Sequence, residues 1–486
     1  MAKFYDTILG EYIKNPWKKG LWLDKLADYY LDYQTMSYDE ITSKQKINFK
    51  EVSLDIALKY SAEDVYITAK IYEIQKKENT HTQSILTDIE IPLLEVLVDM
   101  EIVWVKIDEK ILKEIWEKLK IQIEIEKKAI FWIAKKEFNI NSPKQVWELL
   151  FVDMWLPHSK KTKTWYSVDF EVLETLAIKY PIAKHISNYR QYSKLLSTYI
   201  EWLLKIISKE TNKIHTSYNQ TITTTWRLSS TNPNLQNIPV SSWIAWEIRK
   251  AFIPLNTWDK IMAFDYSQVE VRILAIISKD DNLLWSFIKD ADIHATTWSF
   301  LFWKDTLTND ERKIAKAVNF WVIYWISAFW LSKMIWISMW EAREYIDKFY
   351  EKYPKVKQYF NKVIEECRQK WYTSTMFWRK RFISNINDRN NIIKKAAERE
   401  AMNMPIQWTA ADIIKLAMIK ISKFLKNNNL KSCMIMQVHD EIVFNVKSWE
   451  ENILKKEIKN IMENILDAPI KLKVDIWIWD NWRDVK

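Results

Sequence analysis

The chain has 486 residues, 48% of them hydrophobic and 28% charged, which is the composition of a globular protein of about three domains. Its two cysteines, Cys367 and Cys433, stand far apart and in no metal-ligand spacing, which argues against a disulfide framework or zinc site and for a reducing cytoplasm. No apolar run reaches the ~18–20 residues of a membrane span. The net charge of +9 fits a polyanionic partner, although a ribosomal or membrane-surface protein would share it.

The first half of the chain is mostly helical in pattern. Helical periodicity marks residues 21–30 and 57–75, and the polar patch 76–83 is typical of a linker. A long charged stretch, 108–138, has the Glu/Lys spacing of an exposed amphipathic helix. The segment 211–252 is rich in Ser, Thr, Asn and Pro, which predicts loops and short strands.

The second half mixes strands with helices. Residues 260–264 are apolar and extended in pattern, and helical spacing follows over 267–277. Residues 281–404 are interpreted as a helical block, and 433–446 as a pair of strands. The predicted fold class is therefore α/β (mixed α+β) with a large helical share.

Two aspartates stand at the ends of predicted strands. Asp265 ends an apolar strand just before a helix, and Asp440 and Glu441 lie at the tip of the predicted strand pair. Carboxylates on rigid strand ends among apolar residues are costly unless something neutralises them. Such hard oxygen ligands suit Mg²⁺, and two such ions can clamp the attacking and leaving oxygens of phosphoryl transfer. Taken alone, each aspartate could equally cap a helix or a turn.

A stripe of two cations and two aromatics runs through the helical block. Arg312, Lys316, Phe320 and Tyr324 recur at a spacing of four, which places them on one helix face. The cations could hold the phosphates of a nucleoside triphosphate, and the aromatics could stack near its base and sugar. An amphipathic helix with buried aromatics and snorkelling cations would show the same pattern.

A second stripe carries hydrogen-bonding side chains at the same spacing. Arg399, Asn403 and Gln407 could contact acceptors in the DNA minor groove, which are similar for all base pairs. A solvated polar helix face is the alternative for this stripe taken by itself.

The order of these motifs resembles family A DNA polymerases of the bacterial DNA polymerase I large-fragment type. Residues 223–239, TTTWRLSSTNPNLQNIP, resemble the family signature TGRLSSxxPNLQNIP. Four further segments match, namely 264–272 (motif A), 312–324 (motif B), 399–412 (ERxxxNxPxQGTAAD) and 437–441 (motif C). The resemblance covers about residues 85–486, with the motifs in the family's order.

The resemblance implies a right-hand polymerase with palm, fingers and thumb, preceded by a partial RNase H-like exonuclease domain. The implied boundaries are exonuclease-like 1–84, palm 85–112, 232–280 and 405–486, thumb 113–231, and fingers 281–404.

The resemblance also implies a role for each matching residue. Asp265 and Asp440 would bind two Mg²⁺ ions with the Tyr266 carbonyl, and Glu441 would lie beside them as a catalytic residue. Contacts to the incoming nucleotide would come from Arg312, Lys316, Phe320, Tyr324, His294, Gln268 and Glu270, the last as a steric gate against a 2′-hydroxyl. Contacts to DNA would come from Arg227, Arg399, Asn403, Gln407 and His439.

The implied function is DNA-directed DNA synthesis in repair and replication gap filling. The expected partners are primer–template DNA and dNTPs, and the expected protein is a cytoplasmic, nucleoid-associated monomer that needs no membrane. One alternative is a catalytically degenerate DNA-binding pseudo-polymerase. Another is a relative of the single-subunit RNA polymerases, against which Glu270 and the context of Asp440 favour DNA.

Residues 4–75 resemble the last third of a 3′–5′ exonuclease domain. Tyr60 and Asp64 match its final YxxxD motif, which would supply one metal ligand and one water-orienting hydroxyl. Asp88 and Glu90 have the DxE spelling of an earlier motif, but they follow Asp64 and align with the start of the palm. A two-metal site needs more carboxylates than this, so proofreading is not expected from this chain alone.

Glycine is rare and tryptophan abundant. The chain has 2 glycines and 28 tryptophans, whereas an average chain of this length carries roughly 7% glycine, or about 34 residues. Tryptophan stands at family glycine positions 22, 104, 165, 226, 321, 325, 330, 336, 371, 378, 408, 477 and 479. We hypothesise that the source reads UGA as glycine and that this sequence was translated with UGA as tryptophan; a degenerate protein is the rival explanation.

Overall fold

A four-stranded antiparallel sheet lies at the centre of the molecule, with its strands in the order β10-β5-β9-β8. Its bounds are β5 Asp259–Tyr266, β8 Cys433–Val438, β9 Glu441–Lys447 and β10 Val474–Trp479. The strands β5 and β9 are buried almost throughout, since helices cover both faces. The predicted strand at 260–264 and the strand pair at 433–446 are confirmed.

The computed structural model describes residues 4–18, 20–78, 82–157, 166–238, 243–289, 293, 296, 308, 327–335 and 337–484. The predicted nucleotide-binding residues His294, Arg312, Lys316, Phe320 and Tyr324 lie outside the described residues. Within the described ranges, no helix is both long and apolar enough to cross a bilayer.

Strand alternation divides the core into two parts. On β5, Met262 and Phe264 face one side and pack with the helices α13 (Val269–Ser278) and α20 (Asn391–Asn427). Ile261 and Ala263 face the other side, because successive side chains of a strand point to opposite faces. This second side packs against the base of a helical region that begins with α7 (Glu109–Ala134).

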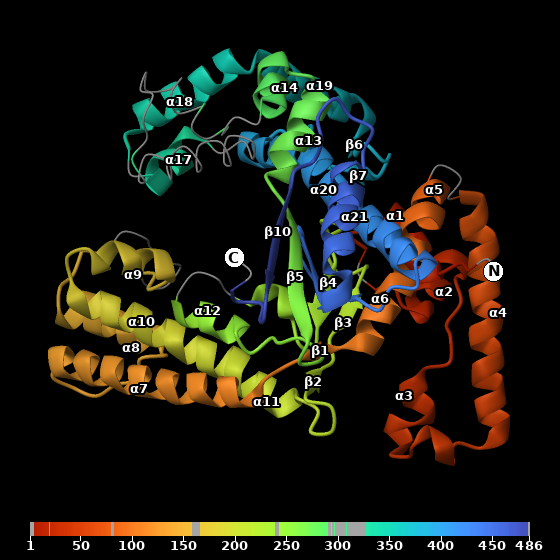
Figure 1. Ribbon diagram of the computed structural model, residues 1–486, viewed down its shortest axis with the longest axis horizontal. Coiled ribbons are helices and arrows are strands. Elements are labelled where there is room, and N and C mark those ends of the chain that lie inside the picture. Colours follow the sequence, from red (N-terminus) through yellow and green to blue (C-terminus); the bar gives the residue numbers. More distant parts are fainter. Residues whose placement is uncertain are drawn as a thin grey trace.

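The helical region forms one end of the molecule (Figure 1). It contains α7 and then α8 Pro143–Trp147, α9 Phe170–Ala177, α10 Pro181–Leu195 and α11 Trp202–Ile206. The long charged helix predicted at 108–138 is confirmed as α7. The Asp108 side chain begins this helix by accepting hydrogen bonds from the backbone N–H groups of Lys110 and Ile111.

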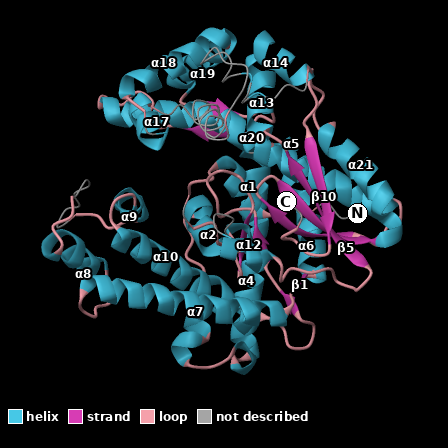
Figure 2. Ribbon diagram, turned by 60° about the vertical axis from the view of Figure 1, so that its left-hand side comes forward, coloured by secondary structure: helices cyan, strands magenta, loops and turns pink. Residues whose placement is uncertain are grey.

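A second helical group lies at the opposite end of the molecule, as both views show (Figures 1 and 2). Its described elements are α14 Asp281–Ile288, α17 Ala328–Ile335, α18 Met339–Lys352, α19 Pro354–Lys370 and the hairpin strands β6 Tyr372–Ser374 and β7 Lys380–Phe382. The hairpin corrects the prediction that 281–404 is helical throughout. Its turn is closed by Thr375, whose side-chain oxygen accepts hydrogen bonds from the N–H groups of Phe377 and Arg379.

The described N-terminal region, 4–78, consists of helices and loops (Figure 1). The helices are α1 Thr7–Lys14, α2 Leu23–Leu31, α3 Tyr38–Ile41 and α4 Leu54–Glu78. Leu26 of α2 packs against Ile67 and Ile71 of α4 in a small core of its own. The remaining elements are α5 Gln83–Ile85, α6 Ile91–Val103, α12 Trp243–Arg249, α21 Glu451–Glu463 and the short strands β1 Val105–Lys106, β2 Lys213–Ile214, β3 Ser217–Asn219 and β4 Ser229–Thr231.

Candidate active site

The two predicted metal-binding aspartates meet at one end of the central sheet. In the antiparallel register of β5 and β9, Asp265 stands directly opposite Glu441. The Tyr266 backbone N–H donates to the Asp440 carbonyl at 3.2 Å, which ties the end of β5 to the β8–β9 turn. The fold therefore brings Asp265 and Asp440, which are far apart in the sequence, to the same end of the sheet.

The turn between β8 and β9 presents Asp440 outward. It has two residues, His439 and Asp440, and His439 adopts a left-handed conformation with φ +55°, as tight hairpin turns require. The Gln437 side-chain amide donates to the His439 carbonyl, and Gln236 donates to the Gln437 side chain at 2.8 Å. These bonds support the turn, in which the Asp440 side chain is half-buried.

Arg227 and Glu270 lie beside Asp440. Arg227 Nη2 is 2.9 Å from Glu270 Oε1 and 3.9 Å from Asp440 Oδ1. Glu270 is buried in the first turn of α13. Burial raises the pKa of Glu270 to about 7, Arg227 opposes that rise, and the Asp440 carboxylate adds to it. A buried carboxyl with so shifted a pKa, next to a pair of strand-end carboxylates, is typical of a functional site.

Glu441 has a different environment from Asp440. It is buried, and its Oε1 accepts a hydrogen bond from Trp482 Nε1 at 3.0 Å. The Arg249 guanidinium lies 3.9 Å from the centre of the Trp482 ring. Trp482 and Arg249 were not predicted, because no local pattern links the C-terminal segment to the β8–β9 turn.

The helix α20 passes close to this site. A narrow crevice is lined by Arg227, His439 and Asp440 together with Ala411 and Ile414 of α20. The predicted DNA-binding stripe Arg399, Asn403 and Gln407 continues the Ala411 face of α20 toward its N-terminus, since its residues recur at a spacing of four. Arg399 is exposed and the other two are half-buried, so the stripe is open to a ligand.

The donor set fits Mg²⁺. Asp265, Asp440 and the Tyr266 carbonyl offer hard oxygen ligands, and the Tyr266 hydroxyl donates to the Met462 carbonyl at 3.0 Å, which anchors the strand end. Across the described part of the chain no group of three or more His, Cys, Asp or Glu side chains could enclose a metal. Mg²⁺ sites in phosphoryl-transfer enzymes use one or two carboxylates and complete the coordination with water and substrate phosphates, so two carboxylates suffice.

A buried ionic cluster beneath the site was not predicted. Arg379 pairs with Glu90 and, through Nε, with Asp412 at 2.5 Å, while Lys415 Nζ lies 2.7 Å from Glu90. All four side chains are at most 1% exposed. Burial alone would raise the pKa of Glu90, but Lys415 and Arg379 lower it to about 2. The cluster joins α20 to the hairpin β6–β7 and to the start of α6.

The two residues of the exonuclease-like motif lie one turn apart on α4. Burial is the main cause that raises the pKa of both the Tyr60 hydroxyl and the Asp64 carboxyl. Glu90 of the DxE spelling belongs to the buried cluster, and Asp88 is exposed. Glu90 therefore has the environment of a residue that stabilises the fold.

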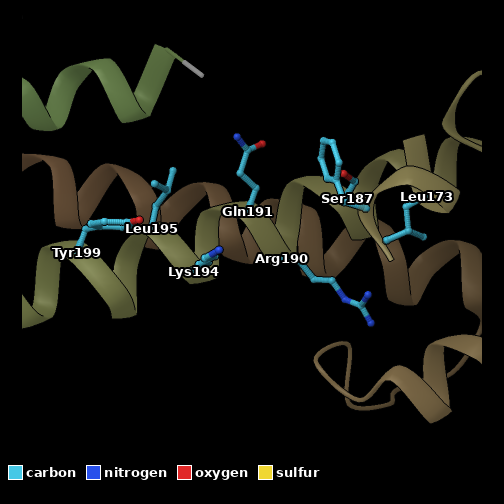
Figure 3. Close-up of a pocket in the computed structure, with 8 residues that line it drawn as sticks. Leu173, Ser187, Arg190, Gln191, Lys194, Leu195 and Tyr199 are labelled. Atoms are coloured by element: carbon cyan, nitrogen blue, oxygen red, sulfur yellow. The ribbon is translucent and has the colours of Figure 1, made fainter. Parts of the chain in front are cut away.

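A separate hollow of about 380 Å³ lies on the helical region (Figure 3). Arg190, Gln191 and Lys194 of α10 line it, and Arg190 also donates to the carbonyls of Val168 and Ile140. None of the residues that line this hollow is a predicted site residue.

Comparisons with known proteins agree with this geometry. The family model for DNA polymerase family A matches residues 109–484, and a model for a 3′–5′ exonuclease matches residues 1–79. DNA polymerase I of Bacillus subtilis is 41% identical over 99% of this chain and 55% of its own length. DNA polymerase I of Bacillus caldotenax is 43% identical over 83% of this chain and 46% of its own length.

The chain thus spans about half the length of the curated relatives it matches. A similar solved structure is the POL domain of Pol1 from M. smegmatis in complex with a DNA primer-template and dNTP. It is 31% identical, with a TM-score of 0.90, and the match covers 99% of this chain and 82% of that one.

Proposed function

Because the chain belongs to DNA polymerase family A, we propose that it is a DNA-directed DNA polymerase, which adds dNTPs to a primer 3′ end and acts in repair and gap filling. The observation that carries the proposal is the meeting of Asp265 and Asp440 at one end of the sheet, with Arg227 and Glu270 beside them. Bound there, two Mg²⁺ ions would offset the charge that develops on the reacting phosphate.

The chain's own residues would position the substrates. Asp265 and Asp440 would hold the metal ions on rigid strand ends, and positioning would supply much of the rate enhancement. His439 would contact the primer end, and Arg227 and the stripe on α20 would contact the minor groove. The palm, thumb and fingers are proposed at the boundaries that the family resemblance implies, with 113–231 as thumb and 281–404 as fingers; α20 runs across the fingers–palm boundary at 404/405.

Extension of a 5′-labelled primer on a DNA template, with Mg²⁺ and one dNTP at a time, tests the proposal. We expect the complementary dNTP to be added at each template base. Tight DNA binding without extension would favour a DNA-binding scaffold. Preferential extension with ribonucleotides would favour a relative of the RNA polymerases.

Glu270 is proposed as the steric gate, and Glu270→Ala tests this role. The buried carboxyl would occupy the space next to the 2′ position, so its removal should reduce discrimination against rNTPs by at least ~10-fold, the scale of one pocket contact. Competing single-nucleotide incorporations of dNTP and rNTP measure the ratio. Glu270→Gln keeps the volume and should keep most of the discrimination; equal loss in both variants would contradict a steric role.

We also infer that this chain alone has no 3′–5′ exonuclease activity. Tyr60 and Asp64 supply one carboxylate, and a two-metal hydrolytic site needs more ligands. Incubating the purified chain with 3′-mismatched primer, Mg²⁺ and no dNTP should leave the primer intact. The Asp64→Ala variant should behave identically, and degradation that Asp64→Ala abolishes would refute the inference.

A further inference from the structure

Tryptophan occurs repeatedly in left-handed backbone. Among the described non-glycine residues, fourteen have a positive φ, and five of these are Trp104, Trp155, Trp226, Trp371 and Trp378, at φ +63°, +52°, +62°, +62° and +67°. The other nine are Asn, Asp, Lys, Gln or His. For a bulky side chain this conformation is a strong outlier, whereas glycine adopts it freely.

These tryptophans stand where chains commonly use glycine. Trp371 follows the last residue of α19, and its N–H donates to the Cys367 carbonyl at 2.7 Å, which is the bond of a glycine helix cap. Trp104 likewise follows the last residue of α6, and its N–H donates to the Met100 carbonyl. Trp378 closes the β6–β7 turn through the Thr375 carbonyl. The backbone geometry therefore favours glycine, which has no Cβ penalty, over tryptophan at each of these positions.

The indole rings also fit their surroundings poorly. The Trp104 ring centre lies 2.9 Å from that of His215 at an angle of 47°, closer than the ~4.5–7 Å of packed aromatic rings. Trp226 is fully buried, and within the described structure its Nε1 has no hydrogen-bond partner. A buried indole normally finds such a partner.

We propose that the tryptophans at these five positions, and those at the family's glycine positions, are glycines in the cellular protein because its source reads UGA as glycine. Composition agrees, because the 2 glycines and 28 tryptophans together make about the number of glycines that a chain of this length carries. The backbone angles are independent of that count, and they identify individual positions.

Position 226 has a consequence for the site, which rests on the proposed function. It directly precedes Arg227, and the turn is closed by the Thr223 hydroxyl, which donates to the Arg227 carbonyl at 2.5 Å. A left-handed residue at 226 sets the direction in which the Arg227 side chain leaves the backbone toward Glu270 and Asp440. Glycine at position 226 would thus position the Arg227 side chain.

Peptide sequencing of the native protein by mass spectrometry tests the proposal without any activity measurement. We expect the peptides to show glycine at positions 226, 371 and 378. The gene should have a UGA codon at each of these positions. Trp482 is the internal control, since its Nε1 donates to the buried Glu441, and it should remain tryptophan, encoded by UGG. Tryptophan at 226, 371 and 378 in the native peptides would overturn the proposal.

Recombinant variants of the chain as written test the structural part. Trp371→Gly should raise the Tm, because a left-handed cap is relieved. Trp285→Gly, in the middle of the helix α14, should lower it, because glycine is unfavourable there. Trp226→Gly should raise kcat for dNTP addition, whereas Trp371→Gly should leave kcat unchanged. A Tm lowered by Trp371→Gly, or a kcat unaffected by Trp226→Gly, would contradict the assignment at that position.

Discussion

Replacing either Asp265 or Asp440 by asparagine should reduce the rate of dNTP addition by at least ~10²–10³-fold, the cost of removing one group that stabilises transition-state charge. The two carboxylates come from neighbouring strands and share one strand end, so neither can substitute for the other. The amide keeps the size of the side chain but loses the negative charge that Mg²⁺ requires. Single-turnover extension of a labelled primer at saturating DNA and dNTP measures the rate.

Asp480→Asn is the matched control. Asp480 is an exposed aspartate at the far end of the same sheet, where it pairs with Lys260 of β5. Its variant should extend primers at the parent rate. Parent-like extension by Asp265→Asn or Asp440→Asn, with the fold intact by circular dichroism, would show that the chemistry occurs elsewhere.

The variant Arg379→Met should lower the free energy of unfolding by ~3–5 kcal/mol, the usual cost of leaving buried charges without their partner. Arg379 is 1% exposed and pairs with both Glu90 and Asp412. Without the guanidinium, Lys415 would be the remaining cation beside two buried carboxylates in this cluster. Urea denaturation followed by circular dichroism gives the difference between variant and parent.

An exposed ion pair provides the comparison. Lys44 pairs with Glu40 across one turn, and both side chains are more than half exposed. Lys44→Met should change the free energy of unfolding by less than ~1 kcal/mol, as is usual for exposed pairs. If Arg379→Met costs no more than Lys44→Met, the buried cluster does not hold α20 and the β6–β7 hairpin in place.

Local patterns predicted the elements that carry the carboxylates. The apolar run before Asp265 and the alternation around His439 and Asp440 are visible within about ten residues, the range over which strand and turn signals act. The pairing of Asp265 opposite Glu441 is a long-range feature. It followed from the family resemblance, and periodicity alone could not have supplied it.

The β6–β7 hairpin was missed for a specific reason. Turns are recognised in a sequence chiefly by glycine, proline and asparagine. The turn of this hairpin has Trp378 at φ +67°, where glycine would have been the expected signal. Because the sequence has only 2 glycines, the glycine signal for turns is largely absent from it.

The buried cluster was missed because its partners are remote in sequence. Glu90 and Lys415 are 325 residues apart, and neither lies in a pattern that predicts burial of a charge. The DxE spelling around Glu90 aligns with the start of the palm, and that alignment does not predict its buried partners. The packing of the β6–β7 hairpin and of the start of α6 against α20 brings the four charges together.

The most direct test of catalysis at Asp265 and Asp440 is a crystal structure of the chain with primer–template DNA, a non-reactive dNTP and Mn²⁺. Anomalous scattering then locates the metal ions independently of the protein coordinates. We predict Mn²⁺ bound between the Asp265 and Asp440 carboxylates and the triphosphate, next to the primer end. A complex with the nucleotide paired to the template but with no metal at these two carboxylates would contradict the proposed mechanism.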